Sequence, residues 1–464
     1  MMDFTGILLQ GSSLPLYEQL YRGLAGAVRS GQLAAGEKLP GKRSLAGQLG
    51  ISVNTVDAAY QLLAAEGYLE SRPRSGYYVL AVEGLHAPPP QPAADPPEPA
   101  PAKWRFDLGT GGVDRELFPF RTWGRIQKEL LYSQPQLLER GDGQGDAELR
   151  AVLADHLRQY RGVRCRPRQV VIGAGIEYLL GLLARLLGEQ AVLAVEDPGY
   201  SRAGRVFANE GVPCRPVAID AGGLSVGALA ASGATAAYVT PSHQFPSGVT
   251  MPAGRRAALL AWATAGPGRF IIEDDYDSEF RFDTRPLPSL QGMDQSGRVV
   301  YVSTFSKSLA PSIRIACMVL PDCLLQPWRE RYGGYACTVS RFEQQTLCRF
   351  IAQGHLARHL ARQRGAYRQR MEEFRRQLAA RLGPGVKIRG QHTGLHLLLE
   401  FEGRREQSLL DAARGEGIRI SGLGEYCVAA RPGPATLLAG YGALPPADIA
   451  LAAEALARAV ERAE

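Results

Sequence analysis

Residues 299–314 read VVYVSTFSKSLAPSIR, an apolar run followed at once by hydroxyl side chains and a single lysine. The run Val299 to Val302 has the length and the β-branched content of a buried strand. Lys307 therefore lies just past the carboxyl end of a strand, where open α/β sheets collect their ligands. A lone lysine on a loop is usually only solvated, so its role depends on the residues that other strands bring to the same edge.

The rest of the chain repeats this pattern of strand and helix. Four more apolar runs, QVVIGAG, AVLAVEDPG, AAYVTPS and RFIIEDD, lie between residues 169 and 275 and alternate with helical segments such as 177–187. Such alternation predicts a doubly wound α/β domain with a mostly parallel sheet. After about residue 320 come a long polar helix at 355–382, short strands and an Ala-rich helix, which predict a smaller α+β lobe.

A proline-rich stretch marks the main domain boundary. Residues 88–101, PPPQPAADPPEPAP, contain eight prolines and no aromatic residue, the composition of a semi-rigid spacer. We therefore expect a small domain at 1–81, a linker at 82–103, a large domain at 104–340 and the C-terminal lobe at 341–464.

The composition is that of a globular protein. No apolar run is long enough for a membrane span, the start lacks a signal-peptide pattern, and seven scattered cysteines form no CxxC pair. We therefore expect a cytoplasmic location, no membrane contact and no metal. The formal net charge is +7, but residues 1–80 hold seven Lys and Arg against six Asp and Glu, so a DNA-binding patch there must be local.

The first eighty residues predict three helices and a hairpin. An apolar residue stands at every fourth position from Leu16 to Val28, a second helix is expected at 44–49, and Ser52 can cap a third. Residues 68–79, YLESRPRSGYYV, predict two strands around a turn. By pattern alone, a DNA-binding module is as consistent with these elements as a dimerisation or ligand-binding module.

The string from Leu16 to Val79 resembles the winged helix-turn-helix of GntR-type bacterial regulators over its whole length. Val53 and Arg74 depart from the Arg and Gly that the family commonly has there, which should change the preferred operator rather than abolish binding. The resemblance implies a double-stranded DNA operator as partner, contacted by Lys42, Arg43, Ser52, Asn54, Thr55, Arg72 and Gly76.

Two further features fit the needs of pyridoxal phosphate, which requires a lysine, a carboxylate beside its ring nitrogen and a phosphate cradle. An acidic cluster, Glu273 to Asp277, follows a buried-strand run and is costly there without a cation, which a pyridinium would supply. A solvated loop or a divalent-metal site is the alternative. Gly173, Ala174 and Gly175 form a turn between strand and helix that can expose backbone N–H groups to a phosphate.

The motifs DPGY, TPSHQFPSG, IEDDYDSEFRF and TFSKSLAPSIR, in this order, resemble the MocR/GabR group of GntR regulators. The resemblance covers the whole chain and implies a winged helix joined to an aminotransferase fold type I domain with a small C-terminal lobe. It implies that Lys307 forms the Schiff base, Asp274 pairs with the ring nitrogen, and Tyr276 bonds the phenolic oxygen. The remaining implied cofactor contacts are Tyr200 on the ring, His243 in place of an asparagine, and Gly173, Ala174, Gly175, Thr304, Ser306 and Arg314 at the phosphate.

An amino-acid effector also needs a partner for its carboxylate. Arg202 is the first candidate, because it lies two residues after the ring-stacking tyrosine, and Arg431 is the second. The histidine pairs at 355 and 359 and at 392 and 396 lack the intervening Glu of a metalloprotease motif, so we interpret them as structural.

The preferred interpretation is a homodimeric regulator that senses pyridoxal phosphate or an amino compound, closest to the regulators of vitamin B6 synthesis. Two alternatives remain. An active aminotransferase would use residues 1–80 as an accessory domain, and a scaffold that lost the cofactor would keep only the fold.

Overall fold

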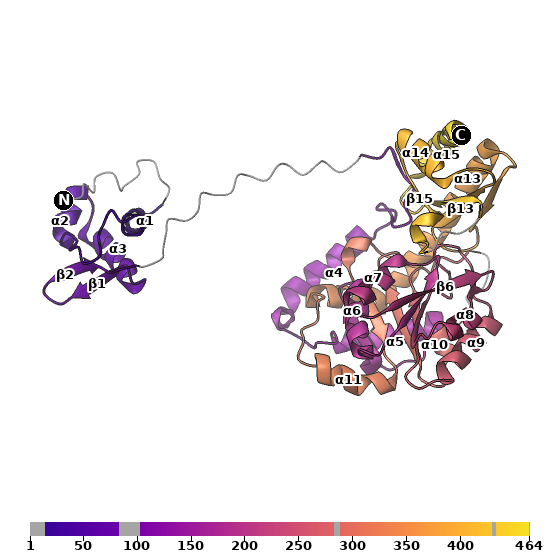
Figure 1. The fold of residues 1–464 in the computed structure, drawn as a ribbon, viewed down its shortest axis with the longest axis horizontal. Coiled ribbons are helices and arrows are strands. Elements are labelled where there is room, and N and C mark those ends of the chain that lie inside the picture. The colour runs from indigo at the N-terminus through magenta and orange to yellow at the C-terminus, as the bar shows by residue number, and fades with distance from the viewer. Residues whose placement is uncertain (1–13, 83–102, 283–287, 429–432, 464) are drawn as a thin grey trace. The chain divides into compact units, whose positions relative to one another are not determined.

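The computed structural model describes residues 14–82, 103–282, 288–428 and 433–463 (Figure 1). The chain divides into two compact units, residues 1–101 and 102–464. Among the helices described, none is long and apolar enough to cross a membrane.

The first unit packs three helices against a hairpin. The helices are α1 (Leu16–Arg29), α2 (Lys42–Leu49) and α3 (Val53–Ala65), and strands β1 (Leu69–Arg72) and β2 (Gly76–Val79) pair antiparallel. Leu20, Leu24 and Leu63 are among the side chains of its buried core. Helix α2 begins two residues earlier than expected, and Gly50 ends it in the left-handed conformation (φ 66°) before α3 starts. The unit is therefore a winged helix-turn-helix.

The second unit is built on an eight-stranded sheet in the order β4-β11-β10-β9-β8-β5-β6-β7. Strands β10, β9, β8, β5 and β6 are mutually parallel, while β11 and the short β7 pair antiparallel to their neighbours. The bounds are β4 Val170–Gly173, β5 Leu193–Asp197, β6 Cys214–Asp220, β7 Gly223–Leu224, β8 Ala236–Val239, β9 Phe270–Asp275, β10 Val299–Thr304 and β11 Ala316–Val319.

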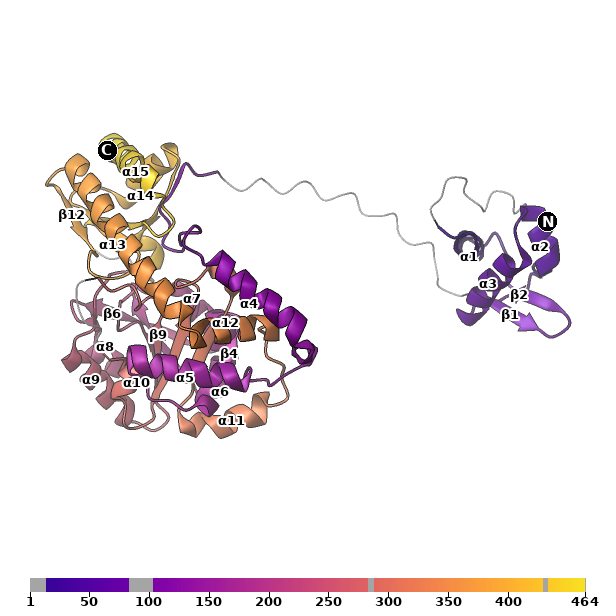
Figure 2. The ribbon, with the colours of Figure 1, turned by 180° about the vertical axis from the view of Figure 1, so that it is seen from behind.

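Helices cover both faces of this sheet, which explains the continuous apolar runs of its strands. Within β4, Val171 faces one core and Val170 and Ile172 face the other, because successive side chains of a strand alternate. Figure 2 shows α4, α5 and α12 on the side nearer the viewer. The bounds are α4 Phe120–Ser133, α5 Ala147–Arg161, α6 Ile176–Leu187, α7 Ser201–Asn209, α8 Val226–Ala231, α9 Ala253–Thr264, α10 Leu290–Met293, α11 Asp322–Tyr332 and α12 Arg341–Ala352.

A smaller lobe follows, with a four-stranded sheet in the order β12-β13-β16-β15. The bounds are α13 His355–Leu382, β12 Val386–Arg389, β13 His396–Phe401, α14 Glu406–Gly415, β14 Ile418–Arg419, β15 Ser421–Gly422, β16 Ala435–Gly440 and α15 Ile449–Arg462.

The long helix α13 packs into the cores of both lobes. Leu356 and Leu360 near its start pack into the core of the large lobe, while Tyr367 and Phe374 pack into the small one. Strand β3 (Phe106–Asp107) also lies in the small lobe, where it pairs parallel with β14. Such distant pairing leaves no local pattern in the sequence.

Candidate cofactor site and DNA-binding surface

Lys307 lies on the loop that follows β10, at the carboxyl edge of the parallel strands. Its Nζ donates a hydrogen bond to the backbone oxygen of Thr110, which lies between β3 and α4. Burial lowers the pKa of this amine to about 8, although the charge of Asp277 acts in the opposite direction. Near neutral pH the uncharged, nucleophilic fraction of Lys307 is therefore much larger than that of an ordinary lysine, at roughly a tenth.

Asp274 stands near the end of the neighbouring strand β9, in register with Val302 of β10. Its side chain is only 4% exposed, and its Oδ2 accepts a hydrogen bond from the hydroxyl of Tyr238 on β8. Its Oδ1 is buried and has no hydrogen-bond partner in the described part of the chain. Burial raises the pKa of this carboxyl to about 7. An orphaned, desolvated acceptor of this kind fits a cationic N–H donor such as a pyridinium.

The other acids of the cluster are also buried, and each has its own partner. Glu273 accepts backbone N–H groups of Leu290 and Gln291, both at 2.8 Å. Asp275 lies 2.6 Å from the guanidinium Nε of Arg161. The alternative of a solvated acidic loop is therefore wrong, and in the described residues no group of three or more His, Cys, Asp or Glu could hold a metal.

Asp277, His243 and Tyr276 form a buried polar chain beside Lys307. The Oδ2 of Asp277 lies 2.8 Å from Nδ1 of His243, and the hydroxyl of Tyr276 lies 3.0 Å from the same nitrogen. The Nε2 of His243 is buried without a partner in the described residues. Because Gly394 has no side chain, the imidazole can pack directly against its backbone, where a Cβ would collide with it.

An aromatic wall closes one side of the site. Tyr200, at the N-cap of α7, stacks on Tyr238 with ring centroids 6.5 Å apart. Phe245 lies edge-on to Tyr200, Tyr276 and Tyr426, the last of which comes from the small lobe. A flat aromatic ligand between Asp274 and Lys307 would therefore meet ring faces rather than water.

The turn between β4 and α6 leads into a helix start, with the N–H of Ala174 donating to Oγ1 of Thr338 at 3.0 Å and that of Gly175 to the backbone oxygen of Gly173 at 2.9 Å. Gly175 has φ 95°, and a Cβ there would collide with the guanidinium of Arg314. That guanidinium donates at 2.9 Å to Glu177 in the first turn of α6, and Arg202 lies 3.7 Å from the same carboxylate. Helix N-termini and arginine forks are the usual phosphate ligands of proteins. The hydroxyls of Thr304, at the end of β10, and Ser306, on the loop before Lys307, are 2.9 Å apart.

Folding thus brings most of the predicted cofactor residues to one edge of the sheet. Arg431 lies outside the described residues. Sequence reasoning missed Thr110, Tyr238, Arg161 and Glu177, which contact Lys307, Asp274, Asp275 and Arg314. No local motif marks them, although Tyr238 in the apolar run AAYVTPS is a polar group on a strand that must be buried.

The predicted DNA-binding residues lie at the starts of α2 and α3 and on the hairpin. The Oγ of Ser52 accepts the backbone N–H of Thr55 at 3.1 Å, and Asn54 in the first turn is exposed. Lys42 is paired with Asp57 and lies over the ring of Tyr77.

Two arginines of this surface differ in their surroundings. Arg43 is exposed and has no ion pair in the described chain, whereas Arg72 in the wing is paired with Glu70 at 2.8 Å. Arg43 is therefore the cation of α2 most available for a phosphate or a base, because Lys42 is held internally.

Comparison with known proteins gives the class of each unit. Residues 16–79 match the family "Bacterial regulatory proteins, gntR family", and residues 106–455 match "Aminotransferase class I and II". The crystal structure of LysN, an α-aminoadipate aminotransferase from Thermus thermophilus, covers 77% of this chain and 92% of its own, with 25% identity and a TM-score of 0.68. The second unit is thus an aminotransferase domain, a fold whose cofactor is pyridoxal phosphate.

Two relatives share both units. The uncharacterised regulator YdeL of Bacillus subtilis is 41% identical over 90% of this chain and 91% of its own. The probable rhizopine catabolism regulatory protein MocR of Rhizobium meliloti is 32% identical over 95% and 92%. The chain therefore belongs to the MocR group of GntR-type transcription regulators, and it is a DNA-binding regulator with a pyridoxal-phosphate domain.

Proposed function

We propose that this regulator holds pyridoxal phosphate through Lys307 and Asp274, and that the ligand bound at this site controls the affinity of the protein for DNA. The single observation that carries the proposal is the buried Oδ1 of Asp274, which has no partner in the described residues and lies one strand away from a lysine of lowered pKa. Tyr200 would cover the ring face, and Tyr276 and His243 would lie at its phenolic oxygen. The phosphate would be held by the 173–175 turn, Thr304, Ser306 and Arg314.

When bound, pyridoxal phosphate supplies an aldehyde that captures amines reversibly. The chain's own residues prepare that capture. Burial keeps part of Lys307 uncharged, Asp274 offers a carboxylate to a protonated ring nitrogen, and the aromatic wall excludes water. An effector carrying a carboxylate would be held by Arg202, with Arg431 as the second candidate.

The pH dependence of cofactor attachment follows from the lowered pKa of Lys307. Below about pH 8 the uncharged fraction of this amine rises roughly tenfold per pH unit, and above that value it levels off. The rate at which added pyridoxal phosphate produces a visible absorption band should follow the same curve. In Asp277→Asn the curve should move to lower pH, because the Asp277 charge raises this pKa. A rate that is constant between pH 6.5 and 9 would contradict the assignment.

The regulatory interpretation is preferred to that of a dedicated aminotransferase, because a DNA-reading module precedes the cofactor domain. The effector is pyridoxal phosphate itself or an amino compound, acting in the cytoplasm. A mobility shift with the DNA flanking its gene, with and without pyridoxal phosphate and a panel of amino acids, tests this directly. If no ligand changes the affinity for DNA, then the site does not act as a sensor.

We further propose that the active form is a homodimer. Several large apolar side chains on and after α4 are exposed, Tyr132 by 83% and Leu138 by 81%. Exposed apolar side chains grouped in this way are typical of protein interfaces. Sedimentation or light scattering should give twice the 50.2 kDa mass of one chain.

In Arg43→Ala, binding to the operator should weaken by roughly 5- to 150-fold, the range of one bidentate arginine contact at about 1–3 kcal/mol. Lys42→Ala is the matched control, because Lys42 is already paired with Asp57 and its removal should cost less. Fluorescence anisotropy with a labelled operator duplex measures both. Equal losses in the two variants would show that Arg43 has no special role in contacting DNA.

A further inference from the structure

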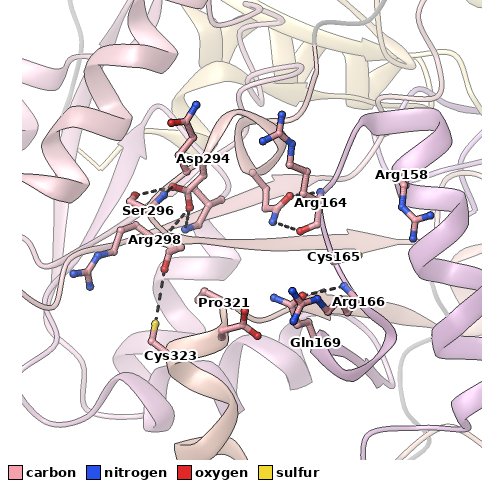
Figure 3. Close-up of a pocket in the computed structure, with 15 residues that line it drawn as sticks. Arg158, Arg164, Cys165, Arg166, Gln169, Asp294, Ser296, Arg298, Pro321 and Cys323 are labelled. Atoms are coloured by element: carbon pink, nitrogen blue, oxygen red, sulfur yellow. Dashed lines mark hydrogen bonds between the residues drawn. The ribbon is translucent and has the colours of Figure 1, made fainter.

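A second basic site lies at the amino edge of the parallel strands, opposite the edge that carries Lys307. It is a groove of about 730 Å³ formed by the end of α5, the segment after it, the start of β10 and the start of α11 (Figure 3). Four arginines line it: Arg158, Arg164, Arg166 and Arg298. Neither the cofactor site nor the winged helix uses these residues.

The segment 163–166 holds two of these arginines in place. Val163 and Cys165 are buried in the core, so that the alternate residues Arg164 and Arg166 are exposed. The backbone of Arg164 is fixed on both sides by the amide of Gln291, with its N–H 2.7 Å from Oε1 and its carbonyl 2.9 Å from Nε2. The two guanidiniums are therefore presented from a fixed backbone, which lowers the entropic cost of holding an anion.

The acids of the groove do not neutralise these arginines. The carboxylate of Asp294 accepts backbone N–H groups of Ser296, Arg298 and Val299, and Asp322 is paired with Arg168 at 3.0 Å. In the described part of the chain, Arg164 and Arg166 have no ion pair. Arg158 is itself paired with Asp155 at 3.1 Å, so the arginines of the groove without an ion pair in the described residues are Arg164, Arg166 and Arg298.

The distribution of charge along the chain points to the partner. Residues 1–80 carry a net charge of only +1, so that 46 basic and 40 acidic residues remain for 81–464. Nearly all of the basic excess of this DNA-binding protein therefore lies outside its DNA-reading unit. The phosphate backbone supplies most of the affinity in non-specific DNA binding, and its contacts are independent of base sequence.

We propose that the groove lined by Arg158, Arg164, Arg166 and Arg298 is a second DNA contact, which binds backbone phosphates while the winged helix reads bases. This inference rests on the DNA-binding function of the chain. It assigns part of the affinity, and none of the base specificity, to the aminotransferase unit. Because the groove lies at the opposite edge of the sheet, DNA bound there leaves the cofactor site open to effectors.

The test measures the full-length holoprotein and its Arg164→Ala/Arg166→Ala variant on a labelled duplex of unrelated sequence and on the intergenic duplex next to its gene. Loss of two phosphate contacts should lower the slope of log affinity against log salt concentration by about 2 on both duplexes. The preference for the intergenic duplex, which comes from base contacts, should stay the same. Arg375→Ala/Arg405→Ala is the matched control, because both arginines are exposed in the small lobe and have no ion pair in the described chain.

Each other outcome overturns the proposal in its own way. If the groove variant keeps the wild-type slope, or if the control variant loses as much, the groove does not contact DNA. If inorganic pyrophosphate raises the Tm of the wild type alone while the slopes agree, the groove binds small phosphates instead. If the wild type binds neither duplex, DNA binding itself has failed, and the visible absorption band would show whether the cofactor domain is intact.

Discussion

Lys307→Ala should purify as a colourless protein and should develop no lysine-linked absorption band when pyridoxal phosphate is added, whereas the wild type should be yellow. The expected loss is complete, because the substitution removes the only atom on this loop able to bond covalently to the cofactor aldehyde. The other contacts, from Asp274, Arg314 and the 173–175 turn, would still favour non-covalent binding. A visible spectrum recorded before and after dialysis separates attached from merely bound cofactor.

The matched control is Lys307→Arg, which keeps a positive charge near Asp277 but cannot attach the cofactor. It should be as colourless as the alanine variant, with a Tm close to that of the wild type. If the wild type itself remains colourless with excess pyridoxal phosphate, the alternative of a scaffold that lost the cofactor would be correct.

Asp274→Asn should weaken the binding of pyridoxal phosphate by roughly 10- to 150-fold, which corresponds to about 1.5–3 kcal/mol for a hydrogen bond to a charged group. The substitution keeps the shape of the side chain and its contact with Tyr238 but removes the negative charge beside the ring nitrogen. The dissociation constant can be measured by titrating the cofactor-free protein and following absorbance.

Glu273→Gln provides the comparison for Asp274→Asn. Glu273 is equally buried on the same strand, but its carboxylate accepts backbone N–H groups at the start of α10. Its substitution should lower the Tm and leave cofactor affinity nearly unchanged. Equal cofactor affinity in Asp274→Asn and the wild type would show that Asp274 does not contact the cofactor.

The sequence predicted the strand-end positions of the site because strand runs and turns are local. Lys307, Asp274 and Gly175 each lie within a few residues of the end of an apolar run, and parallel strands place their carboxyl ends at one edge. The contacts of these residues were not predictable in the same way. Thr110 is 197 positions from Lys307, and Arg161 is 114 positions from Asp275.

The electrostatics of the acidic cluster also required the fold. In the sequence, nothing distinguishes the four acids between Glu273 and Asp277 from one another. A metal site or a solvated loop was therefore a reasonable alternative to a cofactor site. In the structure one acid caps a helix, one pairs with Arg161, one pairs with His243, and Asp274 keeps an oxygen without a partner among the described residues. Only burial and distant partners distinguish these otherwise similar carboxylates.

What the sequence by itself determined was the order of the parts: a winged helix, a proline-rich spacer, and a strand that ends at TFSKSLAPSIR. These features depend on periodicity, turn residues and short motifs, which act over a few neighbouring residues. The tertiary structure alone decided which atoms meet Lys307 and Asp274, and that Arg164 and Arg166 share a groove with Arg298. The physical reason is that desolvation and pairing depend on distances between residues far apart in the chain, which no local pattern encodes.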